Sequence, residues 1–433
     1  MRLKKSTFKT IMYWILVILP IYKDSPLSQY LGFAGYTLLL PVSYIIFSVI
    51  CLWQARVVIE RSLKPLYKLG IWIFIVGELA AFFWFIMTAN LTALGNILPL
   101  KALIVSLEYL AYIIYMSLIL YCIKDQNLDY VFKPIFFTLI LLVLIMLFEI
   151  PQLPFAFRGL HFTGGFPYYR IRLLTKEASE TAMIIFIYGL LSIYYGVVSK
   201  ERVKLLVAVI CTLILLSSTG SKTLISVVGI ATFIYILFRS RQLDIKWFMS
   251  TPLFIVLVAF VILVIYPRLS LDLSNDVDKY TSTATRMYTG ILGLSIGTVF
   301  PFGIGGGIYP MVLQSAMATF LPFYSTLYPN YNMSEIKYLI SSTTDIGVTA
   351  KSSGVQYSMY WGIVGTSFLI FYFHRISKKL VDNQVPAQQF IRSIFWSTII
   401  IVIFISSWDF EFWLLVALII YLPTIGGGKE IVK

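Results

Sequence analysis

The feature that most constrains this chain is a series of apolar segments, each close to the length with which an α-helix crosses a membrane. Such a helix needs about 20 apolar residues. About twelve spans are predicted, near residues 10–22, 34–53, 69–89, 102–122, 133–150, 179–198, 204–219, 223–238, 247–266, 356–374, 390–406 and 409–424. The sequence therefore predicts an all-α polytopic membrane protein, with residues 1–433 forming a single integral membrane domain.

Composition supports this class and excludes others. The 433 residues are 59% hydrophobic and only 12% charged, too little charge to cover a soluble surface. Cys51, Cys122 and Cys211 lie inside apolar runs, so no disulfide framework is expected. His161 and His374 are far apart and bring no cluster of metal ligands with them. We expect no metal, no cofactor and no nucleic-acid partner.

The net charge of +14 is interpreted as a topology signal. Most of the Lys and Arg residues gather in short segments at 2–9, 56–68, 124–133, 200–204, 239–246, 375–392 and 429–433. Short loops rich in Lys and Arg stay on the cytoplasmic side of a membrane. With an even number of spans, both termini are predicted to be cytoplasmic.

Two longer loops then lie on the external side, over residues 151–178 and 267–355. Long connections outside a membrane tend to carry function. Within the second loop, residues 287–300 are apolar but too few to span, which predicts a short interfacial helix.

Basic residues near the predicted external boundary are candidate ligands for an anion. Arginine binds phosphate oxygens in a bidentate way, and lysine adds a point charge. Converging in one cleft, these residues would bind a pyrophosphate; each one alone could instead form a surface ion pair or contact lipid headgroups. The candidates are Arg170, Arg172, Lys222, Arg286 and Lys351.

Acidic residues beside these cations are candidate general bases. Glu177 and Glu180 begin the predicted sixth span, where the alternative role is to cap the helix N-terminus. Glu177 is also close in sequence to Arg172, and we predict that it is the catalytic base. Asp345, shortly before Lys351, is a second candidate.

Two further acids, Glu78 and Glu108, fall inside predicted spans. Ionisable groups are costly inside a membrane and invite a functional hypothesis. Neither is predicted to lie near the external face, so we expect both to serve helix packing.

A glycine-rich segment, Pro301 to Gly307, follows the predicted interfacial helix. Its backbone amides could cradle a phosphate, although the glycine spacing fits neither a Rossmann nor a P-loop pattern. The alternative is a structural turn at Gly303 and Gly305.

The second loop carries a resemblance to a known family. Thr285, Arg286 and Tyr288, followed by the glycine-rich stretch of Phe300 to Gly307, resemble the signature of the bacterial O-antigen polymerase (Wzy) and O-antigen ligase superfamily. That signature is an arginine, then an aromatic residue, then a Pro-x-x-Gly-x-Gly turn; here the first glycine, Gly303, comes one position earlier after Pro301.

Two other segments resemble motifs of the same superfamily. Arg172 to Ser179 resembles its Arg…Glu-Pro-Ser motif, with Ala178 in place of proline. Ser218 to Thr223 resembles its Thr-Gly-Ser-Arg-Ser/Thr turn, with Lys222 in place of arginine.

A fourth segment favours a polymerase over a ligase. Gln356 to Gly365 resembles the segment after the second external loop, which in ligases follows a His-Asn pair. Lys351 and Ser352 stand at the position of that pair, so the ligase histidine is absent here.

The resemblance implies a GT-C-type glycosyltransferase fold in the bacterial inner membrane, with activity at its outer face. Such polymerases transfer a growing glycan from undecaprenyl pyrophosphate onto a lipid-linked repeat unit in surface polysaccharide biosynthesis. They are thought to invert the anomeric configuration without metal, and a chain-length regulator is a possible partner. Arg286 and Glu177 would then be catalytic. The alternatives are an O-antigen ligase, or a flippase for lipid-linked oligosaccharides.

Overall fold

The computed structural model describes residues 5–31, 33–54, 60–163, 165, 167–219, 281–329, 331–345, 347–380, 386–404 and 409–425. The predicted spans at 223–238 and 247–266, together with Lys222, lie outside these residues. Within them the fold is helical, apart from an antiparallel pair of two-residue strands, β1 (Thr92–Ala93) and β2 (Asn96–Ile97). The predicted all-α class is confirmed.

In the described part of the chain, five helices are long and apolar enough to cross a membrane. They are α5 (Lys64–Thr88), α6 (Leu98–Ile123), α7 (Leu128–Glu149), α8 (Ala178–Val198) and α9 (Arg202–Thr219). Four more predicted spans fall on shorter apolar helices, α1 (Lys5–Ile18), α4 (Leu39–Gln54), α18 (Pro386–Phe404) and α19 (Phe410–Ile425). The span at 356–374 falls on α17 (Ser353–Lys378), which is kinked at Gly362.

Short elements connect these helices. They are η1 (Leu19–Ile21), α2 (Ser28–Leu31), α3 (Phe33–Tyr36), η2 (Arg61–Leu63), η3 (Ile150–Gln152) and η4 (Arg158–Leu160).

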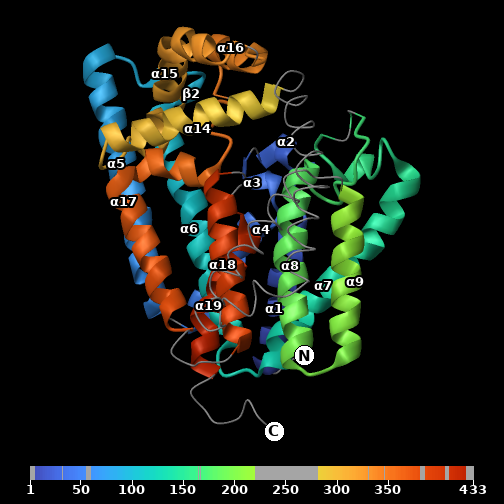
Figure 1. The fold of residues 1–433 in the computed structure, drawn as a ribbon. Helices are drawn as coiled ribbons and strands as arrows, with labels where there is room; N and C mark the ends of the chain where they lie inside the picture. Colours follow the sequence, from blue (N-terminus) through green and yellow to red (C-terminus); the bar gives the residue numbers. More distant parts are fainter. Residues whose placement is uncertain are drawn as a thin grey trace, which may run out of the picture.

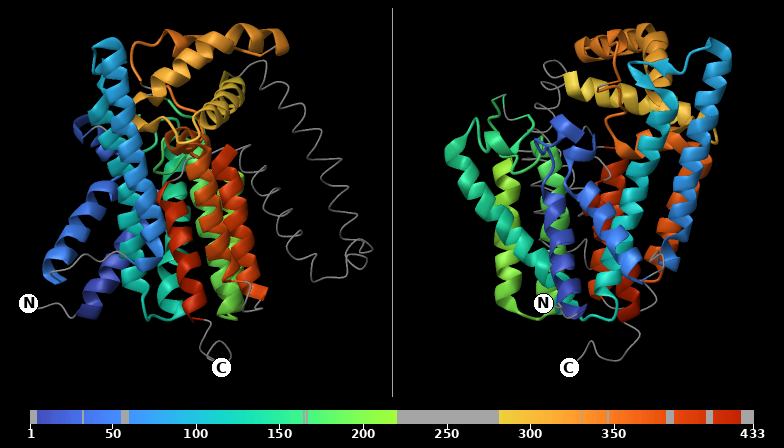
Figure 2. Two further views of the ribbon diagram at one scale, coloured as in Figure 1. Left: turned by 90° about the vertical axis from the view of Figure 1, so that its left-hand side faces the viewer. Right: turned by 180° about the vertical axis from the view of Figure 1, so that it is seen from behind.

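The long helices run side by side, and the helices of the second loop lie across one end of them (Figures 1 and 2). These are α14 (Thr281–Val299), α15 (Gly305–Leu327) and α16 (Ser334–Ser341). We predicted one short helix at residues 287–300, whereas α14 begins at Thr281 and two more helices follow. Pro310 and Pro322 lie inside α15 and weaken its helical pattern in the sequence.

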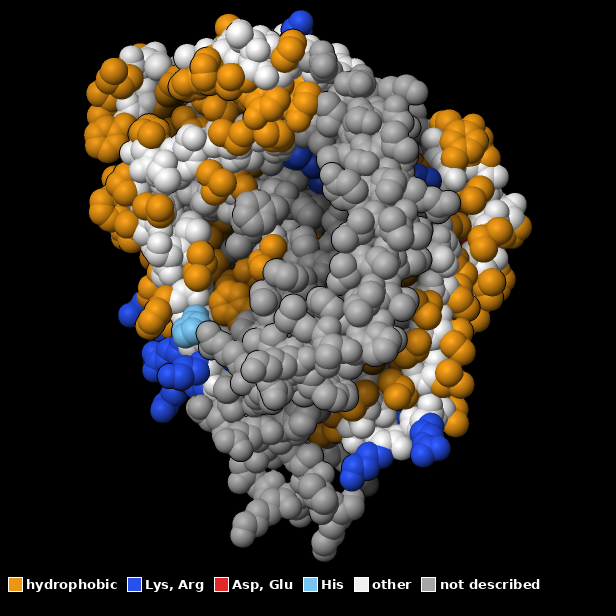
Figure 3. Space-filling view, in the orientation of Figure 1, with side chains coloured by type: hydrophobic (Ala, Val, Ile, Leu, Met, Phe, Trp, Pro, Cys, Tyr) orange, Lys and Arg blue, Asp and Glu red, His pale blue; other side chains and the backbone are white. Residues whose placement is uncertain are grey.

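The start of α1 and the end of α19 lie at the opposite end of the bundle. The ammonium of Lys9 in α1 lies 4.4 Å from the ring centroid of Tyr121, near the end of α6. The Tyr421 hydroxyl of α19 donates to the carbonyl of Gln126, 2.6 Å away in the α6–α7 connection. Lys and Arg side chains gather toward this end on the face shown in Figure 3, and apolar side chains cover much of the described surface above them.

An aromatic cluster fixes α6 against α17 and α19. The Tyr109 ring of α6 lies 5.7 Å from Trp361 and 6.1 Å from Trp413 between ring centroids, in edge-on geometry. One turn further along α6, Tyr112 stacks on Trp413 and meets the edge of Phe410, 5.7 and 4.9 Å away. Buried aromatic pairs add to the stabilisation from their apolar area, so α6 is a firm support for side chains beside this cluster.

Gly303 and Gly305 form a tightly packed turn between α14 and α15. Gly303 has φ +88°, and a Cβ there would overlap the backbone carbonyl of Tyr360. Gly305 has φ +69°, and its Cβ would overlap the backbone of α5. The Gly303 amide donates to the Phe300 carbonyl and the Ile304 amide to the Met359 carbonyl, both at 2.8 Å. These two amides are therefore engaged in packing the turn and are not directed at a phosphate.

We predict that Gly303→Ala destabilises the folded protein by more than about 1 kcal/mol, because alanine is strained at positive φ and its Cβ has no space. The measurement is the thermal stability of the detergent-solubilised protein, followed by size-exclusion chromatography. Gly290→Ala is the control, since a Cβ at Gly290 meets no atom within 4 Å. Equal stability of the two variants would contradict the packing role of the turn.

Candidate functional site

A cavity of about 600 Å³ opens where the two long loops meet the helix bundle. Its walls come from the segment after α1, from α6, from the start of α19 and from both loops. The charged residues that line it are Lys23, Asp24, Glu108, Lys176 and Asp409. The hydroxyl-bearing residues are Ser28, Tyr36, Thr37, Tyr112, Thr163 and Thr349, and the larger apolar ones are Leu40, Phe162 and Phe410. An apolar wall with a few polar groups is typical of a small-molecule site.

Lys23 holds one wall of the cavity together. Its ammonium donates to Asp409 Oδ2 at 2.6 Å and to Glu411 Oε1 at 2.7 Å, and both Lys23 and Glu411 are almost fully buried. Burial opposes the charge of Lys23, but the attraction of Asp409 and Glu411 outweighs it and raises the lysine pKa. The Lys23 amide also donates to the Leu174 carbonyl at 2.9 Å. This residue therefore joins the N-terminal segment to α19 and to the first loop.

Asp24 connects the same segment to the first loop. Its Oδ2 accepts from the Thr163 hydroxyl at 2.6 Å and lies 3.1 Å from Nδ1 of His161. Nε2 of His161 lies 3.1 Å from the Leu173 carbonyl oxygen. All three side chains are wholly or partly buried, so this network orders the first loop around the cavity.

Arg172 contacts this network through Thr163. Its side chain is buried, its Nη1 donates to the Thr163 hydroxyl at 3.0 Å, and its guanidinium carbon lies 5.1 Å from the Tyr168 ring centroid. Its backbone amide donates to Glu149 at 2.9 Å. Arg172 itself is not a cavity-lining residue, but it contacts Thr163, which is one. Arg170 is exposed, and its Nε donates to the Thr219 carbonyl at the end of α9, 3.4 Å away.

Glu177 and Glu180 begin α8 as expected, but they differ in their surroundings. Glu177 is exposed, its carboxylate accepts from the Ser179 hydroxyl at 3.3 Å, and it is not one of the cavity-lining residues. Its neighbour Lys176 does line the cavity. Glu180 accepts from the Tyr36 hydroxyl at 3.2 Å.

Arg286 and Lys351 lie in a second group, in which Glu335 of α16 contacts both Thr285, the neighbour of Arg286, and Lys351. Glu335 accepts from the Thr285 hydroxyl at 2.8 Å and pairs with the Lys351 ammonium at 3.2 Å. Arg286 follows Thr285 on α14 and is half-buried. The Lys351 amide donates to the hydroxyl of cavity-lining Thr349 at 3.4 Å.

The structure therefore places the described basic candidates in two groups. Arg170 and Arg172 are with the first loop, and Arg286 and Lys351 are with the second. Thr163 and Thr349 line the cavity from the two sides.

Asp345, the second candidate base, is held by an ion pair. Its Oδ2 lies 2.6 Å from the Lys101 ammonium. Burial opposes the charged carboxylate, but the hydrogen bond and charge of Lys101 outweigh it and lower the Asp345 pKa. A carboxylate held in this way is a weak base.

Sequence reasoning missed most residues that line the cavity. Lys23 and Asp24 directly follow the first apolar segment, and Asp409 and Glu411 begin the last one, so their placement at span ends was the available signal. Glu108, for which a helix-packing role is expected from the sequence, lines the cavity.

The sequence matches no protein-family model and no curated protein in the comparisons made.

We predict that Lys23→Met lowers the free energy of unfolding by about 3–5 kcal/mol, because it leaves the buried Glu411 carboxylate without its cation. Unfolding in mixed detergent micelles measures this change. Lys351→Met is the matched control and should cost at most about 1 kcal/mol, since Lys351 and Glu335 are each 27% exposed. Similar losses for the two variants would contradict a special role for the Lys23 cluster.

Proposed function

We propose that this chain is a surface-polysaccharide polymerase of the O-antigen (Wzy) type, a GT-C-like glycosyltransferase with about twelve spans. It transfers a glycan from undecaprenyl pyrophosphate to a lipid-linked repeat unit at the outer face of the bacterial inner membrane. Both termini are cytoplasmic, membrane lipid surrounds the helices, and a chain-length regulator is a candidate partner. Four motif resemblances in the family's order support this proposal.

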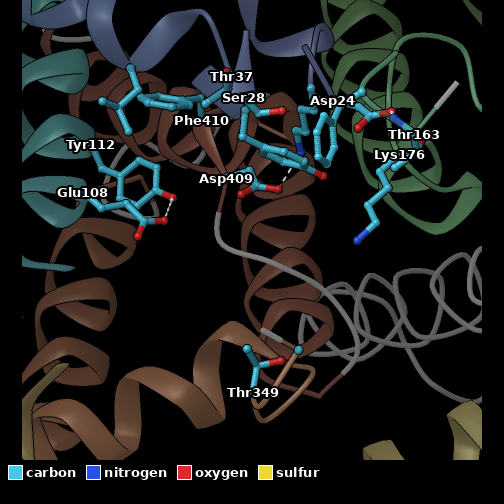
Figure 4. Close-up of a pocket in the computed structure, with 15 residues that line it drawn as sticks. Asp24, Ser28, Thr37, Glu108, Tyr112, Thr163, Lys176, Thr349, Asp409 and Phe410 are labelled. Atoms are coloured by element: carbon cyan, nitrogen blue, oxygen red, sulfur yellow. Dashed lines mark hydrogen bonds and ion pairs between the residues drawn. The ribbon is translucent and has the colours of Figure 1, made fainter. Parts of the chain in front are cut away.

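The observation that carries the proposal is the charge arrangement in the cavity. Lys176 and Glu108 are drawn on opposite sides of it, and the Lys176 ammonium is directed toward the space between them (Figure 4). Lys176 is exposed and forms no salt bridge with the part of the chain that the structure describes. A cation and a carboxylate facing one cavity suit a transfer from a phosphate leaving group to a hydroxyl.

The cations meet the chemical need of the leaving group. As the bond to the anomeric carbon breaks, negative charge grows on the pyrophosphate, and groups that bind this charge more strongly lower the barrier. Lys176 lines the cavity and is the candidate ligand for the pyrophosphate. Arg172 donates to the lining residue Thr163, and the Lys351 amide donates to the lining residue Thr349.

The remaining lining suits a saccharide. Hydroxyls of Ser28, Thr37, Thr163 and Thr349 can donate and accept hydrogen bonds, as sugar hydroxyls do. Apolar side chains beside them cover the less polar faces of a sugar ring.

We predict that Lys176→Ala lowers the rate of glycan polymerisation by about 100-fold, so that long-chain surface glycan is lost. This is the size of effect found when one charge-stabilising donor is removed. The measurement is glycan banding on gels, in a strain whose own copy of the gene has been deleted and replaced by the variant. Lys176→Arg should retain part of the activity, because it keeps the positive charge.

Arg158→Ala provides the control. Arg158 is an exposed cation of the same loop and does not line the cavity. Full glycan length with Lys176→Ala, or glycan of unchanged length after deletion of the gene, would contradict the proposal.

A further inference from the structure

In the part of the chain that the structure describes, three carboxylates line the cavity, and two of them contact other groups of the protein. Asp24 Oδ2 accepts from the Thr163 hydroxyl and lies beside His161. Asp409 Oδ2 accepts from the Lys23 ammonium at 2.6 Å. Asp24 and Asp409 are therefore already bound to groups of the protein itself, and a substrate hydroxyl would have to compete with these contacts.

Glu108 is the third carboxylate, and its hydrogen bond to the protein is longer than the 2.6 Å contacts of Asp24 and Asp409. Its Oε1 accepts from the Tyr112 hydroxyl at 3.3 Å, one helical turn further along α6. No salt bridge joins Glu108 to another residue in the described ranges. One long hydrogen bond from a neutral phenol leaves lone pairs on both oxygens for another donor.

The position of Glu108 is fixed by its surroundings. It lies on α6, about 15 Å along the helix from Leu98, and its partner Tyr112 is packed against Phe410 and Trp413. Catalytic groups act best from rigid elements whose side chains are held by neighbours. Glu108 lies on such an element, beside the packed ring of Tyr112, whereas Glu177 is exposed at the start of α8.

We infer that Glu108, and not Glu177, is the catalytic base of the proposed transfer. This inference rests on the proposed function. The acceptor sugar hydroxyl lies against Glu108 and attacks the anomeric carbon of the donor glycan, forming the new glycosidic C–O bond. The bond from that carbon to the pyrophosphate oxygen breaks, and its electron pair leaves with the pyrophosphate on the Lys176 side. The hydroxyl proton passes to the Glu108 carboxylate.

The opposed placement of base and cation fits an inverting transfer. The nucleophile must approach the anomeric carbon from the side away from the leaving group. A base and a pyrophosphate-binding cation on opposite sides of one cavity satisfy this geometry, and Glu108 and Lys176 are drawn in this relation (Figure 4).

The test compares Glu108→Gln, Glu108→Asp and Glu78→Gln in the gene-deletion strain, with surface glycan length as the readout. Glutamine keeps the size of Glu108 and can still accept from Tyr112, but it cannot take up the proton. We expect Glu108→Gln to lower polymerisation by at least about 100-fold and Glu108→Asp to retain part of it. Glu78 is the matched control, because it is a half-buried acid of the neighbouring span α5 outside the cavity lining.

The outcomes separate this inference from the proposed function. Unchanged glycan after deletion of the gene would refute the polymerase itself. Shortened glycan after deletion, with normal polymer from Glu108→Gln, would refute only the assignment of the base. Membrane content and size-exclusion behaviour of each variant are measured in parallel. Loss of folded Glu108→Gln protein in proportion to the loss of polymer would show a packing role and overturn the inference.

Discussion

The buried ion pairs of Lys23 are the interaction on which the rest of the site depends. A charge removed from water must be paired, and an unpaired partner left behind is strongly destabilising. Lys23 lies after the first apolar segment and its partners Asp409 and Glu411 lie at the start of the last one, so the two ends of the chain are joined at one wall of the cavity. Its backbone bond to Leu174 extends this connection to the first loop.

The second loop is attached to the bundle by a separate set of polar contacts. Asp345 pairs with Lys101 near the start of α6, and Glu335 connects Thr285 with Lys351. Thr349, which lines the cavity, lies between Asp345 and Lys351 in the sequence. The cavity is thus bordered by two loops, and separate sets of polar contacts attach each loop to the rest of the protein.

The sequence predicted the helices well and the cavity poorly, for different physical reasons. A span is a local property, so α6 at Leu98–Ile123 follows closely from the apolar window at 102–122. An ion pair such as Lys23 with Asp409 joins residues 386 positions apart, and one sequence alone contains no signal for which charges meet. The same limit explains why Glu108 was interpreted as a packing residue. The role proposed for Glu108 depends on residues that are distant in the sequence, such as Phe410 and Thr349, and that line the same cavity.

The division of labour in the proposed mechanism follows from what each element can hold. A base must keep its oxygen within hydrogen-bonding reach of one hydroxyl, and a helix locked by aromatic packing, such as α6 beside Trp413, provides that precision. A pyrophosphate offers many equivalent oxygens, so cations on loops can bind it without the same accuracy. The base is therefore better supplied by the helix bundle and the cations by the loops. Two residues of the same loop, such as Glu177 and Arg172, would not give the base this precision. The position of Glu108 within α6 is then an advantage, since water that would compete with the acceptor hydroxyl is more easily excluded there.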